Sequence, residues 1–396
     1  MKQSADLKRL LTSIDHKSYP AYKDVRGAYD FNTYILSIDH VQGDPFASPS
    51  KVSVQVRHAK AGFPAELFDT PWKKTALEDY LLRCFSREIG RLSFKAKGSG
   101  KSGLIATSRP GQEVLSRTAC EIGRNEITAR FEVGFPAFGR TINSGELIRI
   151  FFDFLPGCVE NVFFYRRQNN AEIKKRITLA DDQQFIRNEL KRLDLVSFVA
   201  DGSILPRETG VSDRPMKGSV AFHSPDSLRI TLNLPGHGPI SGMAIHRGIT
   251  LIVGGGYHGK STLLKALESG VYNHIPGDGR EYVITDETAV KLRAEDGRSI
   301  NHVDISLFIR DLPNKKRHHL LFHRRCQRQY LPGGSVIESI EAGARAFLID
   351  EDTSATNFML RDDLMQRIVS RDKEPITPFI ERARDLYKQA ASPPSS

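Results

Sequence analysis

The spacing of apolar residues along the chain predicts a fold of mixed helices and strands. Residues 51–57 place a valine at every second position, which is the period of a half-buried strand, and residues 127–134 repeat this alternation. Residues 75–89 carry large apolar side chains at every fourth position, as the buried face of a helix requires. Thr75 and Glu78 have the spacing of a capping box, so this helix is predicted to begin at Thr75.

A change in composition near residue 200 predicts a domain boundary. A second amphipathic helix is predicted for 181–195, and the stretch 201–218 that follows is rich in Pro, Arg, Ser and Gly. We therefore expect an N-terminal α+β domain in 1–205, an α/β domain in 206–389 and an unstructured tail in 390–396.

The composition indicates an ordinary globular protein of about two domains. The 396 residues carry a formal net charge of +10, with 39% hydrophobic and 26% charged residues. No run of about 18 apolar residues is present, and the N-terminus does not have the pattern of a signal peptide. We therefore expect a soluble, cytoplasmic protein without a membrane partner. The four cysteines lie far apart, so neither a zinc site nor a disulfide framework is indicated.

Residues 254–262 fit the pattern GxxxxGK[ST] (Walker A) of a phosphate-binding loop. The β-branched run 249–253 before it predicts a strand buried on both faces, and 263–269 after it predicts a helix. Lys260 is expected to bridge the β- and γ-phosphates, and Ser261 to hold Mg²⁺. The candidate nucleotide-binding residues are Gly254, Gly255, Gly256, Tyr257, His258, Gly259, Lys260, Ser261 and Thr262. The alternative is a glycine-rich turn without a ligand.

A second acidic motif lies downstream of this loop. The apolar residues 346–349 predict a buried strand that ends at Asp350 and Glu351. Asp350 is expected to reach Mg²⁺ through water, as a Walker B carboxylate does. Glu351 and Lys260 are the candidate catalytic residues, with Glu351 as the general base that accepts a proton from the attacking water. The alternative is a strand end with two solvated carboxylates.

Two further motifs resemble ligand sites less closely. Residues 98–103, Gly-Ser-Gly-Lys-Ser-Gly, match the second half of a phosphate loop, but Lys95 stands where the first glycine belongs. We interpret them as a flexible basic loop, with an auxiliary phosphate contact as the alternative. Residues 39–45 contain two aspartates and a histidine, but Asp and Gly before Pro are more typical of a turn than of a metal site.

The residues after the second acidic motif resemble a known class of ATPases. Residues 350–357, Asp-Glu-Asp-Thr-Ser-Ala-Thr-Asn, are similar to the Walker B motif and D-loop of ABC-type ATPases. The resemblance extends over nearly the whole chain to the family of predicted ATPases of the ABC class. The motifs that carry it are residues 24–30 (DVRGAYD), 39–45 (DHVQGDP), 98–103 (GSGKSG), 272–280 (YNHIPGDGR) and 291–298 (KLRAEDGR).

This resemblance implies a family-specific N-terminal domain, an ABC-type P-loop core, and ATP with Mg²⁺ as ligands. ABC-type ATPases bind ATP between the phosphate loop of one subunit and the signature loop of the other. The resemblance therefore also implies a head-to-tail homodimer with two composite sites. It does not imply a transporter, because the nucleotide domain is fused to no apolar segment long enough to span a membrane.

The signature loop is where this sequence departs from the family. The family's Ala-Ser-Gly-Ser-Thr-Ser-Gln-Ala-Ala corresponds to residues 326–334, Cys-Gln-Arg-Gln-Tyr-Leu-Pro-Gly-Gly, and 331–335 can be taken as a degenerate signature. One permitted encoding of 326–334, read one nucleotide later, encodes the family's sequence in full. We therefore interpret 317–334 and 390–396 as out-of-frame translation and expect an ATPase core truncated at its C-terminus. A solvated basic loop is the alternative for 317–334.

These motifs predict an ABC-class protein that binds ATP and, in the intact family, hydrolyses it. A second hypothesis is a nucleic-acid-binding protein in which ATP controls the dimer, with RNA or DNA bound by basic residues in 95–101 and 166–167. A third is a pseudo-ATPase that binds nucleotide without turnover, because the signature loop is altered.

Overall fold

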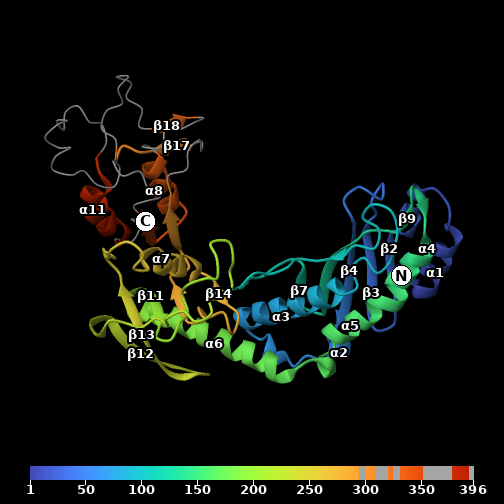
Figure 1. Cartoon of the computed structure of the whole chain (residues 1–396), viewed down its shortest axis with the longest axis horizontal. Helices are drawn as coiled ribbons and strands as arrows, with labels where there is room; N and C mark the ends of the chain where they lie inside the picture. Colours follow the sequence, from blue (N-terminus) through green and yellow to red (C-terminus); the bar gives the residue numbers. More distant parts are fainter. Residues whose placement is uncertain (294–299, 309–319, 324–330, 351–376, 392–396) are drawn as a thin grey trace. The chain divides into compact units, whose positions relative to one another are not determined.

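The chain folds into two compact units, coloured along the sequence in Figure 1. The computed structural model describes residues 1–293, 300–308, 320–323, 331–350 and 377–391. Unit 1 comprises residues 1–184 together with 274–276, and unit 2 comprises 185–273 and the residues from 277 onward. The boundary between 205 and 206 that composition suggests stays a prediction.

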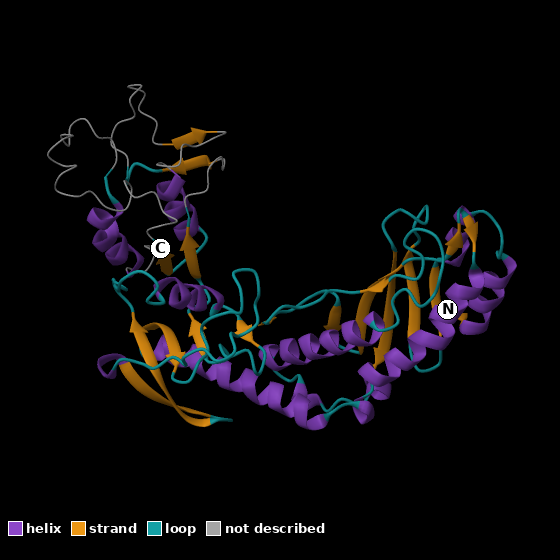
Figure 2. Ribbon diagram, in the orientation of Figure 1, coloured by secondary structure: helices purple, strands orange, loops and turns teal. Residues whose placement is uncertain are grey.

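Unit 1 is built on one mainly antiparallel sheet with helices packed against it (Figure 2). The strand order is β1-β2-β3-β4-β8-β5, β7 also pairs with β8, and only β1 and β2 run parallel. The sheet is formed by β1 (Lys2–Gln3), β2 (Gly27–Asp30), β3 (Ile35–His40), β4 (Ser50–Arg57), β5 (Ile105–Ala106), β7 (Cys120–Ile122) and β8 (Glu126–Val133). Outside it, unit 1 contains β6 (Glu113–Val114) and the antiparallel pair β9 (Ala137–Phe138) and β10 (Thr141–Ile142).

The helices of unit 1 supply the other half of its core. They are α1 (Ser4–Ser13), α2 (His58–Ala61), α3 (Pro71–Gly90), α4 (Ser144–Ile148), the π-helix η3 (Arg149–Phe154) and α5 (Leu155–Phe163), with the 3₁₀ turns η1 (Tyr19–Val25), η2 (Ala65–Leu67) and η4 (Tyr165–Arg167). Phe85 of α3 contacts both Phe131 of β8 and Phe163 of α5, with ring centroids 5.4 and 5.2 Å away. These rings therefore join both helices to the sheet.

Both strands predicted from alternating residues are confirmed at the centre of the sheet. β4 and β8 pair antiparallel along their full length, from Ser50 opposite Val133 to Arg57 opposite Glu126. The valines of β4 are buried against the helices, as the alternation predicts.

Helix α3 begins earlier than predicted. Its first residue is Pro71, and the hydroxyl of Thr70 accepts a hydrogen bond from the N–H of Lys73 (3.4 Å). Thr75 lies inside the helix, where its hydroxyl donates to the carbonyl of Pro71 (2.9 Å). The predicted start at Thr75 is therefore wrong, because proline in the first turn has no N–H to satisfy and favours an earlier helix start.

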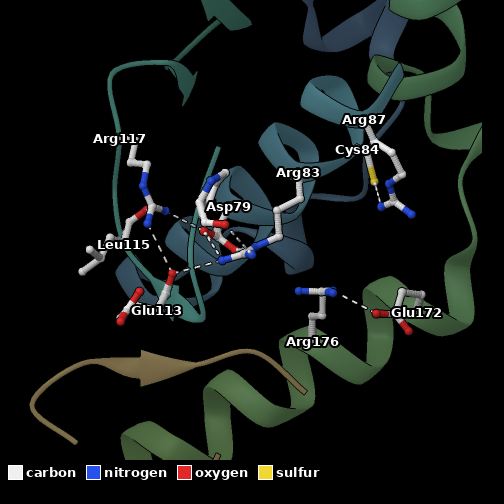
Figure 3. A network of polar contacts seen from close by, with 10 residues as sticks. Asp79, Arg83, Cys84, Arg87, Glu113, Leu115, Arg117, Glu172 and Arg176 are labelled. Atoms are coloured by element: carbon white, nitrogen blue, oxygen red, sulfur yellow. Dashed lines mark hydrogen bonds and ion pairs between the residues drawn. The ribbon is translucent and has the colours of Figure 1, made fainter. Parts of the chain in front are cut away.

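The buried carboxylate of Asp79 on α3 connects this helix to the segment 113–117 before β7 (Figure 3). Oδ2 of Asp79 accepts from Nε of Arg83 (2.5 Å), and Oδ1 accepts from Nη1 of Arg117 (2.7 Å). Both guanidinium groups also donate to the carbonyl of Glu113, at 3.1 and 3.3 Å. The side chain of Asp79 is inaccessible to solvent, so this network replaces the water that its charge would otherwise bind.

Residues 98–103 form a hydrogen-bonded turn, which differs from the flexible loop predicted for them. The N–H groups of Ser99, Lys101 and Gly103 donate to backbone carbonyls at 2.7, 2.9 and 2.9 Å. Gly103 has a φ of +77°, and a Cβ there would lie 2.0 Å from the carbonyl oxygen of Ala96. Because these three N–H groups already have partners, they are not available to bind a phosphate as those of a phosphate loop are.

Unit 2 contains a four-stranded antiparallel sheet in the order β12-β13-β11-β15, a parallel pair β16–β19 and an antiparallel pair β17–β18. Helix α6 (Asn170–Arg192) contributes its residues from Phe185 onward. The remaining described elements are β11 (Leu195–Ala200), η5 (Asp226–Leu228), β12 (Arg229–Leu234), β13 (Gly238–His246), α7 (Lys260–Ser269), β14 (Asn273–His274), β15 (Val283–Thr285), β16 (Ala289–Leu292), β17 (Ile300–Asp304), β18 (Leu320–His323), α8 (Leu331–Glu341), β19 (Ala346–Ile349) and α11 (Phe379–Ala391).

The strand predicted for 249–253 is not formed. This segment has irregular backbone, and Ile249, Leu251 and Val253 are 67%, 81% and 77% exposed. An apolar, β-branched run becomes a strand only where a neighbouring strand pairs with its N–H and C=O groups. Among the residues that the structure describes, no strand pairs with 249–253, so the run stays irregular and exposed.

Candidate phosphate-binding site

Helix α7 begins at the predicted phosphate loop. Gly259 caps its N-terminus with a φ of +86°, a left-handed conformation that glycine adopts without strain. Ala266 and Leu267 are buried, so α7 forms because one apolar face packs into the core. The N–H groups of residues 260–262 have no partner within an α-helix that starts there, and they carry the positive end of the helix dipole. This end of α7 is therefore suited to an anion.

The loop before α7 satisfies its own polar groups. Nζ of Lys260 donates to the carbonyl of Gly254, and the N–H of Gly255 donates to Nδ1 of His258 (3.0 Å). A Cβ on Gly255 would lie 2.9 Å from Cε1 of His258, so this approach of the ring requires glycine. Tyr257 has a φ of +61°, and its side chain is fully exposed. The ammonium and the N–H that a phosphate would engage are thus paired inside the loop.

The apolar strand predicted to lead to Asp350 packs against α7. β19 ends one residue before Asp350, which confirms the strand predicted for 346–349. Leu348 of β19 belongs to the same buried cluster as Ala266 and Leu267 of α7. β16 pairs in parallel with β19, with Lys291 opposite Leu348. The fold therefore places the helix of the phosphate loop against the strand that leads to Asp350.

An ion pair joins α7 to β16. Nζ of Lys291 on β16 lies 2.9 Å from Oε2 of Glu268 on α7, and the side chain of Lys291 is 7% exposed. Because water screens it poorly on the lysine side, this pair holds α7 more firmly than an exposed pair would. Lys291 is the first residue of the family motif 291–298, and nothing in that motif predicts its contact with Glu268.

Two buried arginines bind the C-terminal end of α7. Arg187 of α6 donates to the carbonyl of Gly270, which caps α7 (3.5 Å), and to that of Val271 after it (3.0 Å), and Arg280 donates to Oγ of Ser269 (3.1 Å). Burial lowers the pKa of Arg187 and lowers the pKa of Arg280 to about 10. Arg280 therefore stays charged at neutral pH, and both guanidinium groups lie where a cation complements the negative end of the helix dipole. Neither arginine is predicted from the sequence, because the partners are backbone carbonyls, a hydroxyl and an amide oxygen, which leave no motif with a fixed spacing.

The structure brings the predicted phosphate and metal residues to neighbouring elements. Residues 254–262 form the loop and first turn of α7, with the side chain of Ser261 exposed at that turn, and Asp350 follows β19. Hydroxyl and carboxylate oxygens are ligands that Mg²⁺ accepts, and the glycine-rich cradle before a helix N-terminus suits a polyphosphate. The residues present therefore fit Mg²⁺ and nucleotide. Glu351, the predicted base, lies outside the described residues.

The predicted signature region is described only in part. Residues 317–319 and 324–330 lie outside the described residues, as do 392–396 of the tail. Residues 331–335 form the first turn of α8, and Ser335 is buried there.

The side-chain contacts of residues 39–45 do not support a metal site there. Oδ2 of Asp39 accepts from the hydroxyl of Ser53 (3.0 Å), and Asp44 pairs with Arg140 (2.9 Å). Within the part of the chain that the structure describes, no group of three or more His, Cys, Asp and Glu side chains is placed to hold a metal ion.

Comparisons with known proteins define the class. A family model of the P-loop domain of ABC ATPases matches residues 169–392, and a model of the N-terminal domain of ATPases of the ABC class matches residues 4–166. The chain is thus a P-loop protein with an ABC-type ATPase domain. It belongs to the family of ATPases of the ABC class, as its motifs predicted.

One relative is the uncharacterized protein MJ1628 of Methanocaldococcus jannaschii. The two sequences are 30% identical over 189 residues, which are 45% of this chain and 42% of the relative. The chain therefore spans less than half the length of this relative. Among the helices that the structure describes, none is long and apolar enough to cross a membrane.

Proposed function

We propose that this protein binds ATP with Mg²⁺ at the phosphate loop 254–262. The observation that carries the proposal is the position of Lys260, directly behind a glycine-rich loop and at the anion-binding end of α7. The ammonium of Lys260, now on the carbonyl of Gly254, would turn to the β- and γ-phosphates, and the first-turn N–H groups would bind the phosphate oxygens. The hydroxyl of Ser261 and the carboxylate of Asp350 would hold Mg²⁺, which neutralises charge on the phosphates.

Hydrolysis is the second step of the proposal. The carboxylate of Glu351 accepts a proton from water, the water oxygen bonds to the γ-phosphorus, and the bond from that phosphorus to the bridging oxygen breaks to release ADP. In this scheme two copies bind ATP head to tail, so that the signature region of one faces the phosphate loop of the other. A cytoplasmic location completes the proposal.

The phosphate loop is tested by Lys260→Ala. Losing one charge-assisted contact of roughly 1.5–3 kcal/mol should weaken ATP binding about 10- to 150-fold. Lys265→Ala, on an exposed residue of the same helix, is the matched control and should bind ATP as the parent does. Equal ATP affinity in the Lys260→Ala protein would refute the assignment.

Turnover is tested by Glu351→Gln. This variant should bind ATP, fail to hydrolyse it, and shift toward dimer in sedimentation experiments with ATP. If the parent binds ATP with no hydrolysis, the protein is a pseudo-ATPase that uses nucleotide only as a ligand. Undiminished hydrolysis by the variant would remove Glu351 from the role of base.

A second candidate function, nucleic-acid binding, is supported by a surface on unit 1. Phe46 and Phe138 are 63% and 61% exposed. A Cβ on Gly100 of the basic turn would lie 3.0 Å from the ring of Phe46, and the N–H of Ser99 bonds the carbonyl of Ala137, next to Phe138 (2.7 Å). The turn contains Lys101, and Lys95 and Lys97 lie just before it. Exposed rings beside cations are the features by which proteins bind single-stranded nucleic acid.

This candidate is tested by the double variant Phe46→Ala/Phe138→Ala. Since stacking contributes about 1–3 kcal/mol per base, binding of a labelled single-stranded RNA should weaken at least ten-fold, and binding by the parent should fall steeply with salt. The control, Val211→Ala/Val220→Ala, removes two apolar side chains of unit 2 that are more exposed still, at 98% and 91%. RNA binding that is absent from the parent, or equal in both variants, would exclude this surface.

A further inference from the structure

A cavity on unit 1 has no role in the proposed ATP chemistry. Its volume is about 420 Å³, which falls in the range of small-ligand sites, roughly 300–1,000 Å³. Three segments build it, namely the turn after β2, helix α2 with the residue that follows it, and the turn η4 after α5. The lining residues are Asn32, Thr33, Lys60, Ala61, Gly62, Phe164, Tyr165 and Arg166.

The cavity has a positive charge. Lys60 and Arg166 line it, and none of the described residues that line it is acidic. The ammonium of Lys60 donates to the carbonyl of Asn32, which uses one of its three donors. Arg166 and Arg167 both pair with the carboxylate of Glu160, at 3.1 and 3.3 Å. These three side chains therefore have a net charge of +1. An anion in the cavity would therefore meet two cationic side chains.

The cavity also has an aromatic wall. Phe164 is buried beneath it, and the guanidinium of Arg166 lies 5.6 Å from the centroid of the Phe164 ring. The half-buried ring of Tyr165 packs against Phe63, with centroids 5.5 Å apart, which holds Tyr165 at the wall. Flat rings stack on aromatic side chains whatever their substituents. Charge, size and wall together suit a ligand that combines a phosphate with a flat ring.

We propose that this cavity binds a nucleoside monophosphate unit, with the phosphate between Lys60 and Arg166 and the base against Tyr165. Such a unit can come from a free mononucleotide or from one residue of a single-stranded nucleic acid. All the lining residues belong to unit 1, whereas the phosphate loop belongs to unit 2. The proposal therefore does not rest on ATP binding at Lys260.

The test uses the whole chain with Lys260→Ala, which keeps the phosphate loop from contributing. Calorimetry measures the binding of UMP and of an eight-residue uridine strand. In Lys60→Met/Arg166→Gln the Kd should rise at least about ten-fold, because two cationic contacts to the phosphate are lost. The matched control, Lys23→Met/Arg26→Gln, removes the same charges from exposed residues of unit 1 outside the cavity and should bind as the parent does.

The outcomes separate the two sources. If UMP binding falls in the cavity variant alone, the cavity takes a free mononucleotide. If only the strand binds the parent, and its binding falls in the cavity variant alone, the ligand is a residue of a nucleic acid. The proposal is overturned if neither probe binds the parent, or if the cavity variant and the control bind equally.

Discussion

Nζ of Lys291 lies 2.9 Å from Oε2 of Glu268, and this contact connects the helix of the phosphate loop to the strand beside the one that leads to Asp350. In the proposed site, phosphate is bound at one end of α7 and the metal carboxylate stands at the end of β19. The ion pair therefore acts on the spacing between these two groups, although neither of its members touches nucleotide.

Lys291→Met should lower the free energy of unfolding by about 1–3 kcal/mol, between the values for exposed and for buried pairs, because Glu268 is left without its partner. The variant should also need more Mg²⁺ for half-maximal ATP binding. Urea unfolding and ATP titrations at several Mg²⁺ concentrations measure the two effects. The exchanged pair Glu268→Lys/Lys291→Glu should restore much of the loss. If the exchange rescues nothing, the contact is not an ion pair that positions α7.

His258→Ala should tighten nucleotide binding by roughly 2- to 10-fold. Nδ1 of His258 takes the N–H of Gly255 (3.0 Å), so a phosphate must first displace a neutral hydrogen bond of about 0.5–1.5 kcal/mol. Kd values for ATP from parent and variant measure this directly. Weaker binding in the variant would show instead that the ring helps to bind the nucleotide.

Asp79→Asn should destabilise unit 1 by about 3 kcal/mol, because the amide neutralises a buried carboxylate that compensates Arg83 and Arg117. Urea unfolding followed by circular dichroism provides the measurement. Glu88→Gln removes a carboxylate of the same helix that pairs with the exposed Arg91, and it should cost less than about 1 kcal/mol. Similar losses in the two variants would mean that burial of Asp79 has no energetic consequence.

Glu78 should make stability depend on pH. Burial raises the pKa of its carboxyl above the ordinary value of 4.5, although Oε1 accepts from the N–H of Ile122 (2.7 Å). A raised pKa in the folded state stabilises the fold below the unfolded pKa, and this contribution is lost as pH rises through the folded pKa. Relative to Glu78→Gln, the parent should therefore lose stability as pH rises above the ordinary pKa of 4.5. Parallel stability profiles for parent and variant would contradict this.

The local sequence pattern was sufficient to predict an element where its hydrogen-bond partners lie close in the sequence or where its apolar residues repeat with a clear period. β4 and β8 formed as their alternating residues predicted. α7 followed its glycine-rich loop, because a helix needs only local hydrogen bonds and one apolar face. The family motifs likewise pointed to the ABC class that the two family models identify.

The run 249–253 shows why local pattern was not sufficient elsewhere. Its composition favours a buried strand, yet a strand depends on pairing with a distant segment, and no described strand pairs with it. The turn 98–103 shows the opposite error. Its glycines and lysine predict a flexible loop, but its N–H groups donate to carbonyls of residues distant in the sequence, which hold it in one conformation.

The sequence by itself determined the motif at 254–262, the acidic strand end at Asp350 and the membership of the ABC class. Only the tertiary structure decided which groups surround them. Lys291 pairs with Glu268, two buried arginines bind the end of α7, and Lys60 and Arg166 line one cavity. The reason is that motifs record chemistry within a few consecutive residues, whereas ion pairs and cavities arise when packing brings together segments that the chain keeps far apart.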